Sequence, residues 1–405
     1  MVVVPAKMGR INKRTLLWRL QRMGVASRAD LAKSLGMSHP TAGKIADELL
    51  ELGVLEEANA DEGIGRIDTG RLTLPPARMG RPGRMLRLNR SHARFLAIQL
   101  GVSRTNLSAL PVGADGEDRW TVEVDTPNSA DSWVHELRRA VGQIAGKDFW
   151  GVLVSVPGIV DERSGRVLFS PNLHWTESVE LAGLIQQVWS APVVLVQEER
   201  ALALGHQYLD PQSEDFLLVD FGDGVGGAAI LAGKLHESPL PLSGELGHTP
   251  VLGSRRPCGC GAVGCVETLV STKGLLQSFA EHHGQPLGPW SALRAALERN
   301  GMERWLAATL DATASVIAGA LNVLGLNHLI VTGSLTELPP AVMDYLSAAI
   351  VKGAMWARFG MVKVEAAPRR RAAGLVAVGL DRVVLPMTRV VEINPDLAAL
   401  RSQVA

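Results

Sequence analysis

All three cysteines of this 405-residue chain lie within eight positions, at Cys258, Cys260 and Cys265, and His248 lies ten positions before the first of them. Two kinds of chemistry use cysteines grouped in this way, metal binding and thiol redox exchange. Three thiolates and one imidazole complete a tetrahedral shell without an open position, which is the composition of a structural zinc site. A redox pair more often has the spacing C-x-x-C. We therefore expect a structural Zn²⁺ ion held by His248 and the three cysteines, on a loop that the glycines between them allow to fold tightly.

Two glutamates lie beside this cluster. Glu245 precedes His248 by three residues, and Glu267 follows Cys265 by two. As ionised carboxylates, both could accept hydrogen bonds from the hydroxyl groups of a sugar. A single glutamate on a loop is more often a solvated surface charge, so these two residues alone do not decide whether a ligand binds here.

The chain that must position this site has an ordinary globular composition, with 46% hydrophobic and 20% charged residues. Its net charge is zero, but residues 1–90 carry 16 basic against 9 acidic side chains, and the remainder carries 25 against 32. A basic first domain on an acidic body suggests that the N-terminal part binds a polyanion. The N-terminus lacks the apolar stretch of a signal peptide, and Asn322, Asn327 and His328 interrupt the longest apolar run. We therefore expect a cytoplasmic protein without a disulfide framework.

A helix, a tight turn and a second helix are predicted near the N-terminus, after an amphipathic helix in "NKRTLLWRLQRMG". Ser27 is placed to cap one helix that ends at Gly36, and Ser38 to cap the next, whose apolar face includes Ile45 and Leu49. The pattern is typical of a helix-turn-helix, although an ordinary helical hairpin has the same outline. In a helix-turn-helix, the first turns of the last helix approach base edges in the major groove of DNA. The candidate DNA-reading residues are Ser38, His39, Thr41 and Lys44.

The continuation of this segment predicts a β-hairpin wing. "VLEE" follows Gly53, a long polar stretch comes next, and "RMGRPGRMLRLNR" returns the chain. We expect the tip of the wing at about 59–79. Arg81 and Arg84 flank a Pro-Gly pair, so their guanidinium groups are candidates for phosphate or minor-groove contacts. Residues 1–90 are thus predicted to form a winged helix-turn-helix that binds double-stranded DNA.

From residue 91 onward, short apolar runs alternate with amphipathic helical stretches, which is the pattern of an α/β fold. Runs such as "FWGVLVSVPGIV" and "DFLLVDFGDGVGGAAILAG" are interpreted as buried strands. Glycine-bearing strand turns occur in two separate halves, which suggests a duplicated architecture. We expect a first α/β lobe over 91–200, a second lobe with the zinc site over 201–385, and a C-terminal tail over 386–405.

Several motifs, taken together, resemble the ROK family (repressors, open reading frames, kinases). "SRADLAKSLGMSHPTAGKIADELLELGVLEE" and "GRPGRMLRLN" are similar to the DNA-binding head of its sugar-responsive regulators. Successive motifs of its body are similar to "VSVPGIVDERSGRVLFSPNLHW", "GDGVGGAAILAGKL", "GELGHTPV" and "CGCGAVGCVE". The resemblance implies an actin-like, hexokinase-type ATPase fold with a sugar cleft between two lobes, and zinc on the four ligands named above. It also implies sugar contacts from Glu245, Glu267, His248 and Asn172.

The motifs that serve phosphoryl transfer in ROK kinases are altered in this sequence. Their first phosphate turn, D-x-G-G-T, corresponds to "QLGVS", with Gln99 in place of the aspartate. Their catalytic stretch, similar to E-N-D-A-N-A-A-A, corresponds to "VQEERALA", where Gln197 replaces the asparagine and Glu198 the catalytic aspartate. The extra methylene of Glu198 displaces its carboxylate from the position that proton transfer requires. Arg200 replaces the second asparagine and is expected to pair with an acid, whereas "GDGVGG" keeps its glycines and leaves nucleotide binding open.

We therefore expect a transcriptional regulator, a repressor of carbohydrate-related genes, that senses a sugar or sugar derivative in a cleft that no longer transfers phosphate. A homodimer or a dimer of dimers is expected, because paired heads read two half-sites on DNA. No catalytic residue is assigned, and Glu198 marks a degenerate base position. The alternative is an active ROK kinase that phosphorylates a hexose or an amino sugar and carries a DNA-binding head. The candidate effector contacts are Asn172, Gln197, Glu198, Glu245, His248 and Glu267.

Overall fold

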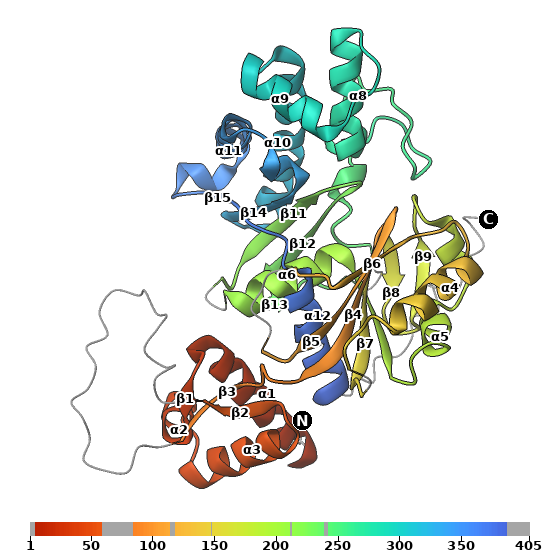
Figure 1. Cartoon of the computed structure of the whole chain (residues 1–405). Helices are drawn as coiled ribbons and strands as arrows, with labels where there is room; N and C mark the ends of the chain where they lie inside the picture. The colour runs from red at the N-terminus through yellow and green to blue at the C-terminus, as the bar shows by residue number, and fades with distance from the viewer. Residues whose placement is uncertain are drawn as a thin grey trace.

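The computed structural model describes residues 5–58, 84–113, 118–146, 148–210, 213–238 and 242–386. The predicted wing tip at 59–79, Arg81, and the predicted tail from 387 onward lie outside the described residues. Figure 1 shows three parts: a small N-terminal head, a first lobe, and a second lobe that carries most of the long helices.

The head consists of three helices and a three-stranded antiparallel sheet in the order β1-β3-β2. Ser27 forms a capping box with Asp30 at the start of α2, and Gly36 ends this helix with a φ of 63°. Ser38 caps α3 by accepting a hydrogen bond from the backbone N–H of Thr41. The three predicted capping positions are thus confirmed. The elements are α1 (Pro5–Met23), β1 (Ala26–Ser27), α2 (Arg28–Leu35), α3 (His39–Glu51), β2 (Leu55–Ala58) and β3 (Met85–Leu88).

Each lobe contains one five-stranded sheet, and the two sheets have the same topology. In each, three consecutive strands form an antiparallel meander, and two later strands add in parallel beside the first of them. The duplicated architecture is therefore confirmed. The first sheet contains β4 (Ala93–Leu100), β5 (Arg104–Pro111), β6 (Val122–Asp125), β7 (Gly151–Val156) and β10 (Val193–Gln197). The second contains β11 (Phe216–Phe221), β12 (Val225–Leu231), β13 (Lys234–Leu235), β14 (His328–Gly333) and β15 (Lys363–Ala366).

Helices cover the outer face of each sheet through its apolar side chains. On the first sheet these are α4 (Ala130–Val141) and α5 (Leu181–Gln186), with a hairpin of β8 (Ile159–Asp161) and β9 (Arg166–Phe169) and the short helix η2 (His174–Ser178) nearby. The second lobe contains η3 (Leu246–His248), α7 (Glu267–Val270), α8 (Thr272–His283), α9 (Trp290–Asn300), α10 (Arg304–Leu324), η4 (Ser334–Glu337), α11 (Pro340–Gly353) and η5 (Met355–Arg358).

Two helices, α6 (Glu198–Leu209) and α12 (Arg371–Gly379), lie on the inner faces of the sheets and pack against each other. α6 contacts β11 and β12 of the second sheet, whereas α12 contacts β4 and β7 of the first. Glycines let the two backbones touch. A Cβ atom at Gly205 would lie 1.8 Å from the carbonyl oxygen of Arg370, and one at Gly374 would lie 1.7 Å from that of Ala201.

The lobe limits of 91–200 and 201–385 remain a prediction. α12 falls within the predicted second lobe but packs on the first sheet, because its apolar residues cover the inner faces of β4 and β7. A π-helical turn, η6 (Leu380–Val384), continues α12.

The head packs on the C-terminal end of α6. The ring of Trp18 meets Tyr208 edge-on with centroids 5.7 Å apart, and Gln21 Nε2 donates a 3.0 Å hydrogen bond to the carbonyl oxygen of Tyr208. Arg14 forms a 2.5 Å ion pair with Asp381 of η6. One apolar core runs from α1 through Tyr208 to α12, so the head and the helix pair share a continuous interior.

Among the described residues, α10 is the one helix long and apolar enough, by length and composition alone, to cross a membrane. Its residues Leu306, Leu310, Ile317 and Leu321 are buried in the core of the second lobe, against α8 and α11. We therefore describe α10 as a core helix of this lobe.

The contact between α6 and α12 predicts that Gly205→Ala lowers the free energy of unfolding by ~1–3 kcal/mol or more, because the added methyl group overlaps a backbone carbonyl that cannot rotate away. Chemical unfolding followed by circular dichroism measures the change. Gly319→Ala is the matched control, since a Cβ there meets nothing within 4 Å on α10 and should stabilise the helix by ~0.5–1 kcal/mol. If Gly205→Ala were as stable as the wild type, the close backbone contact between α6 and α12 at this position would be wrong.

Candidate functional site

A cavity of about 350 Å³ lies between the lobes. It is lined by residues at or just after the carboxyl ends of β4, β7, β10, β11 and β14, which is where α/β sheets most often bind ligands. All six candidate effector residues line this cavity: Asn172, Gln197, Glu198, Glu245, His248 and Glu267. The structure brings them together, and their contact with an effector stays a prediction.

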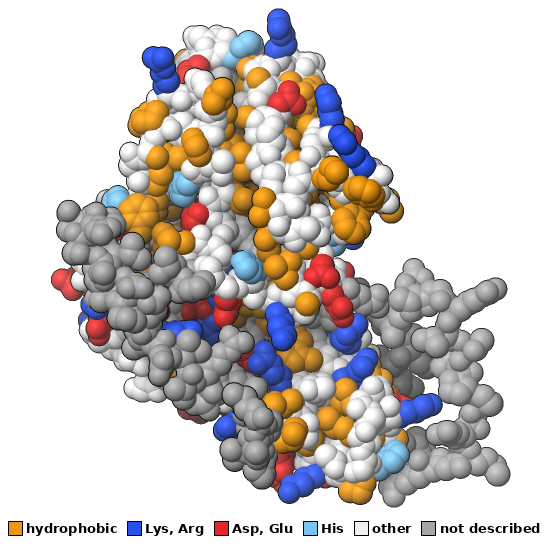
Figure 2. Space-filling model, turned by 180° about the vertical axis from the view of Figure 1, so that it is seen from behind, with side chains coloured by type: hydrophobic (Ala, Val, Ile, Leu, Met, Phe, Trp, Pro, Cys, Tyr) orange, Lys and Arg blue, Asp and Glu red, His pale blue; other side chains and the backbone are white. Residues whose placement is uncertain are grey.

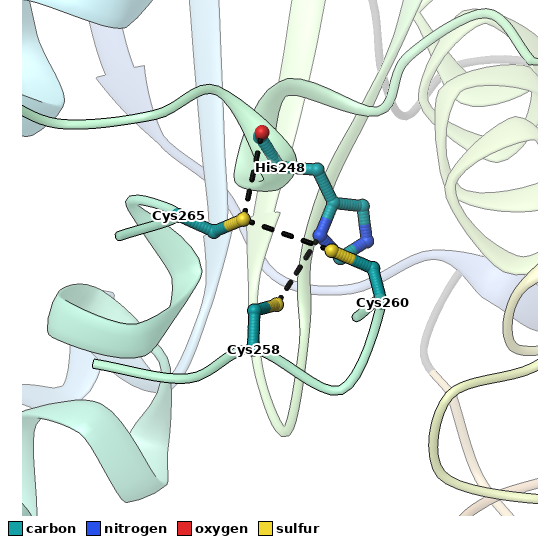
Figure 3. Close-up of side chains that lie close together, drawn as sticks. All are labelled: His248, Cys258, Cys260 and Cys265. Atoms are coloured by element: carbon teal, nitrogen blue, oxygen red, sulfur yellow. Dashed lines mark hydrogen bonds between the residues drawn. The ribbon is translucent and has the colours of Figure 1, made fainter. Parts of the chain in front are cut away.

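The four predicted zinc ligands converge beside the cavity. Their ligand atoms all lie within 4.8 Å of one another, and Figure 3 shows the four side chains pointing toward one another. His248 Nδ1 lies 3.5 Å from Cys258 Sγ, and Cys260 Sγ lies 3.7 Å from Cys265 Sγ. Sulfur atoms bound to one tetrahedral zinc ion at about 2.3 Å lie roughly 3.8 Å apart, whereas a disulfide brings them to about 2.05 Å. The geometry therefore fits a His-Cys₃ zinc site and not a disulfide.

Burial also affects two of the thiols in this cluster. Burial raises the pKa of Cys258 to about 12, and it also raises the pKa of Cys265. Without a cation the buried thiols would stay protonated, whereas Zn²⁺ binds and stabilises thiolates. Two isolated antiparallel β-bridges hold the loop itself, one between Pro250 and Cys265 and one between Pro257 and Val263.

His248 connects the cysteine cluster with the cavity. While its Nδ1 faces Cys258, its Nε2 lies 3.7 Å from Glu245 Oε2. Gln197 Nε2 donates a 3.1 Å hydrogen bond to Glu245 Oε1 across the cavity. Burial raises the pKa of Glu245 above its ordinary value, although His248 and Gln197 act against this effect. Glu267 accepts a 2.9 Å hydrogen bond from the backbone N–H of Val225 and so fixes the turn before β12.

The degenerate base position is occupied by an ion pair. Glu198, the first residue of α6, pairs with Arg371, the first residue of α12. Arg371 is 2% exposed and also lies 3.4 Å from Asp118 Oδ2. The predicted pairing of Arg200 is confirmed as well, since its Nε lies 3.0 Å from Glu162 Oε1.

A second ion pair, between Asp220 and Arg369, was not predicted from the sequence. Arg369 Nε and Nη2 donate two 2.8 Å hydrogen bonds to the carboxylate of Asp220, which also accepts one of 2.7 Å from Thr332. Burial acts to raise the pKa of Asp220, but the hydrogen bonds and charge of Arg369 lower it below its ordinary value. A Cβ at Gly222 would lie 2.7 Å from Arg369 Nη2, so the guanidinium group lies directly over the "GDG" turn. An aspartate inside the apolar run "FLLVDF" was the available signal, because a buried carboxylate needs a partner.

Glu199 was also missed. It lines the cavity on α6 beside Glu198, and its carboxyl group lies against the backbone of β12. The only sequence signal for Glu199 as a cavity residue was its position directly after Glu198.

The candidate DNA-reading residues lie together on the head. Ser38, His39, Thr41 and Lys44 are exposed over the first turns of α3. The hydroxyl of Ser38 is engaged in the helix cap and lies 2.8 Å from Thr41 Oγ1. Arg84 is exposed and forms a 2.7 Å ion pair with Glu57 on the neighbouring strand.

The equivalent sheets, the cavity between them and the cysteine loop define a two-lobed α/β protein of the actin-like, hexokinase-type fold. The family model described as "ROK family" matches residues 95–378, so the chain belongs to the ROK family.

Two relatives illustrate the range of this family. A xylose repressor from Caldicellulosiruptor bescii is 26% identical over 282 residues, which cover 66% of this chain and 65% of the repressor. An N-acetylmannosamine kinase from Escherichia coli O1:K1 is 32% identical over 184 residues, which cover 44% of this chain and 62% of the kinase. The matches thus span just under two thirds of the length of these relatives.

Solved structures share the fold. A ROK family transcriptional regulator, described as a homolog of the E. coli MLC protein, has a TM-score of 0.70 at 19% identity and covers 94% of this chain and 98% of its own. A ROK family glucokinase from Streptomyces griseus, in complex with glucose and AMPPNP, has a TM-score of 0.58 at 21% identity and covers 70% of this chain and 97% of its own. The fold resemblance to the regulator therefore extends over more of this chain than the resemblance to the glucokinase.

If His248 and the three cysteines hold zinc, purified protein should contain one zinc ion per chain by metal analysis. Chelation or Cys265→Ser should lower the Tm by about 10 °C, because a few kcal/mol of binding energy are lost and 1 kcal/mol shifts the Tm of a large domain by about 2–4 °C. His283→Ala is the control, since His283, with His282 and Glu303, forms the other His-containing cluster among the described residues. Loss of the ion in His283→Ala, or its retention in Cys265→Ser, would argue against the assigned ligands.

Proposed function

We propose that this chain is a DNA-binding transcriptional repressor whose ROK cleft senses a sugar or sugar derivative. The observation that carries the proposal is the connection of two surfaces by one helix. α6 begins in the cavity at Glu198 and ends under the head, where Tyr208 contacts Trp18 and Gln21. The exposed turns of α3 on that head are free to enter the major groove of DNA.

The head has the element order of a winged helix-turn-helix. α2 and α3 form the helical pair, and β2 and β3 pair as antiparallel strands at the base of the predicted wing, whose tip at 59–79 lies outside the described residues. A 2.6 Å ion pair between Lys13 and Glu48 ties α1 to α3, so the recognition helix has a fixed support. His39 and Lys44 are the side chains best placed to reach bases or phosphates, because Ser38 is used as a cap.

The cavity suits a polyhydroxylated ligand. Carboxylates of Glu245 and Glu267 accept hydrogen bonds, and the amides of Asn172 and Gln197 both donate and accept them. The xylose repressors among the relatives support a response to sugar. The zinc ion would keep the loop that carries these glutamates in place.

The phosphate-transferring parts support sensing over catalysis. Glu198 is neutralised by Arg371, so its carboxylate is poorly placed to take a proton from a sugar hydroxyl. At the end of β4, where kinases have an aspartate, the amide of Gln99 accepts a 3.0 Å hydrogen bond from Asn106. We therefore assign no kinase activity.

Dimerisation of a cytoplasmic protein completes the proposal, because two heads are needed to read two half-sites. Apolar side chains are exposed over the second lobe, as Figure 2 shows, and aromatic and methionine residues are enriched at protein interfaces. The most exposed of these near η5 are Met355, Trp356, Phe359 and Met361.

The head predicts selective DNA binding. The protein should bind its own promoter fragment at least tenfold more tightly than random DNA of equal length, measured by fluorescence anisotropy at physiological salt. His39→Ala or Lys44→Ala should each raise the Kd about tenfold, since a base or phosphate contact is worth ~1–3 kcal/mol. Arg299→Ala removes an exposed charge in the last turn of α9, far from the head in Figure 1, and serves as the control. Arg84→Ala should also reduce, by about one, the slope of the logarithm of the binding constant against the logarithm of the salt concentration. Equal affinity for the promoter and random DNA would refute DNA-based regulation.

The kinase alternative is tested separately. In a coupled assay with ATP and a panel of hexoses and amino sugars, we expect no sugar-dependent turnover, because the carboxylate of Glu198 is held by Arg371. Sustained turnover that disappears in Glu198→Gln would identify an enzyme instead.

A further inference from the structure

Glu199 has an environment that differs from that of the other acids in the cavity. Glu198 is paired with Arg371, Asp220 with Arg369, and Glu245 contacts Gln197 and His248. Among the described residues, no other side chain forms a hydrogen bond or ion pair with Glu199, whose carboxyl group accepts a hydrogen bond from the backbone N–H of its own residue at the start of α6. Each nearby cation is already engaged by another carboxylate.

The space around Glu199 is shaped for its carboxyl group. A Cβ at Gly226 of β12 would lie 2.6 Å from Glu199 Oε1 and 2.8 Å from its Cγ. Any larger residue at 226 would therefore push the carboxyl group from its place. On its open side Glu199 faces the cavity, whose wall also carries Glu198, Asp220 and Glu245.

This environment disfavours a negative charge on Glu199 in the free protein. Burial raises its pKa well above the ordinary value, and the charges of Glu198, Glu245 and Asp220 raise it further. A carboxyl group in such a place that lacks a cationic partner is stabilised by a proton or by a cation. Among the described residues that line the cavity, Arg369 carries the one guanidinium or ammonium group, and it is bound to Asp220.

We propose that the effector carries a basic amine in addition to its hydroxyl groups, as amino sugars and aminocyclitols do, and that its ammonium group binds Glu199. This inference rests on the proposed function, because it names the ligand class of the same cleft. The hydroxyl groups would face Glu245, Glu267 and Asn172, which are the polar groups toward the zinc side. Asp223 also lines the cavity, and together with Glu199 it disfavours an anionic ligand.

The proposal is tested by calorimetric titration of the full-length, zinc-loaded protein at pH 7. The probes are glucosamine, 3-amino-3-deoxyglucose and 6-amino-6-deoxyglucose, which place the amine at three positions on the same ring. Glucose and N-acetylglucosamine are the neutral references. At least one amine should bind about tenfold or more tightly than both references, since one charge-assisted hydrogen bond contributes an effect of this size.

Glu199→Gln keeps the shape of the protonated side chain but cannot ionise. In this variant the preference for the amine should fall below about threefold. Gly226→Ala, which displaces the carboxyl group by a steric contact, is the second variant and should reduce the same preference; unfolding curves of both variants establish that they fold. Wild-type protein that binds no amine more tightly than glucose would overturn the inference, as would an unchanged preference in both variants.

Two controls separate this inference from its alternatives. A Tm increase with Mg²⁺ alone that is lost in Glu199→Gln would identify a metal site and overturn the amine assignment. Promoter binding is measured in the same samples. If the protein binds its promoter selectively and glucose releases it from the DNA while none of the amines does, the proposed function stands and only the amine assignment is wrong. Absence of selective DNA binding removes the regulator itself.

Discussion

Two glycines set the distance between α6 and α12, and the arrangement of the molecule depends on that distance. With no side chain at Gly205 or Gly374, the backbone of each helix touches a carbonyl oxygen of the other segment. Each helix covers the inner face of one sheet, so their contact fixes how the lobes face each other and how wide the cavity is. It also brings the first residues of the helices together, which is why Glu198 and Arg371 can pair. Close packing of this kind does not deform gradually, because a larger separation would lose the contact entirely.

The charges of the cleft follow from this geometry and divide it in two. On the side of the glycine turns, Asp220 and Glu198 are neutralised by arginines that precede or begin α12. On the opposite side, Glu245 lies between Gln197 and His248, and among the described residues no arginine or lysine forms an ion pair with it. The first side of the cleft is thus occupied by internal ion pairs. The second side retains open hydrogen-bonding capacity, which favours recognition of a ligand over transfer of a group.

Local features were predictable from the sequence because their causes are local. Ser27, Gly36 and Ser38 act on backbone groups within a few positions, and the three cysteines and His248 lie within one loop. The alternation of apolar runs with helices predicted the α/β class, since each strand carries its own burial pattern. The resemblance to the ROK family supplied Asn172 and Gln197 as cavity residues, which spacing alone could not have done.

The features that were missed depend on contacts between distant residues. Arg369 lies 149 positions from Asp220, and Arg371 lies 173 positions from Glu198. The sequence around these residues does not indicate which acid pairs with which arginine. The pairing is decided by the packing of α12 on the first sheet, which brings Arg369 and Arg371 to the cavity. Glu199 was missed for a related reason. Its isolation results from the engagement of every nearby cation elsewhere, and a sequence does not display an absent partner.

The same helix contact constrains how a ligand could alter the head. α6 has 12 residues and is about 18 Å long at 1.5 Å per residue, with Gln197 just before its first turn and Tyr208 in its last. Its hydrogen-bonded backbone moves as one unit, and the contact with α12 near Gly205 acts as a fixed point. A ligand that drew the cysteine loop toward Gln197 would therefore change the tilt of α6 rather than its length. Trp18 and Gln21 of α1 contact Tyr208, which lies on α6 beyond that fixed point. A change in the tilt of α6 would therefore move α1 and, with it, the direction of α3. In the proposed regulator, the ligand would control DNA binding to the extent that it binds one tilt more tightly than the other.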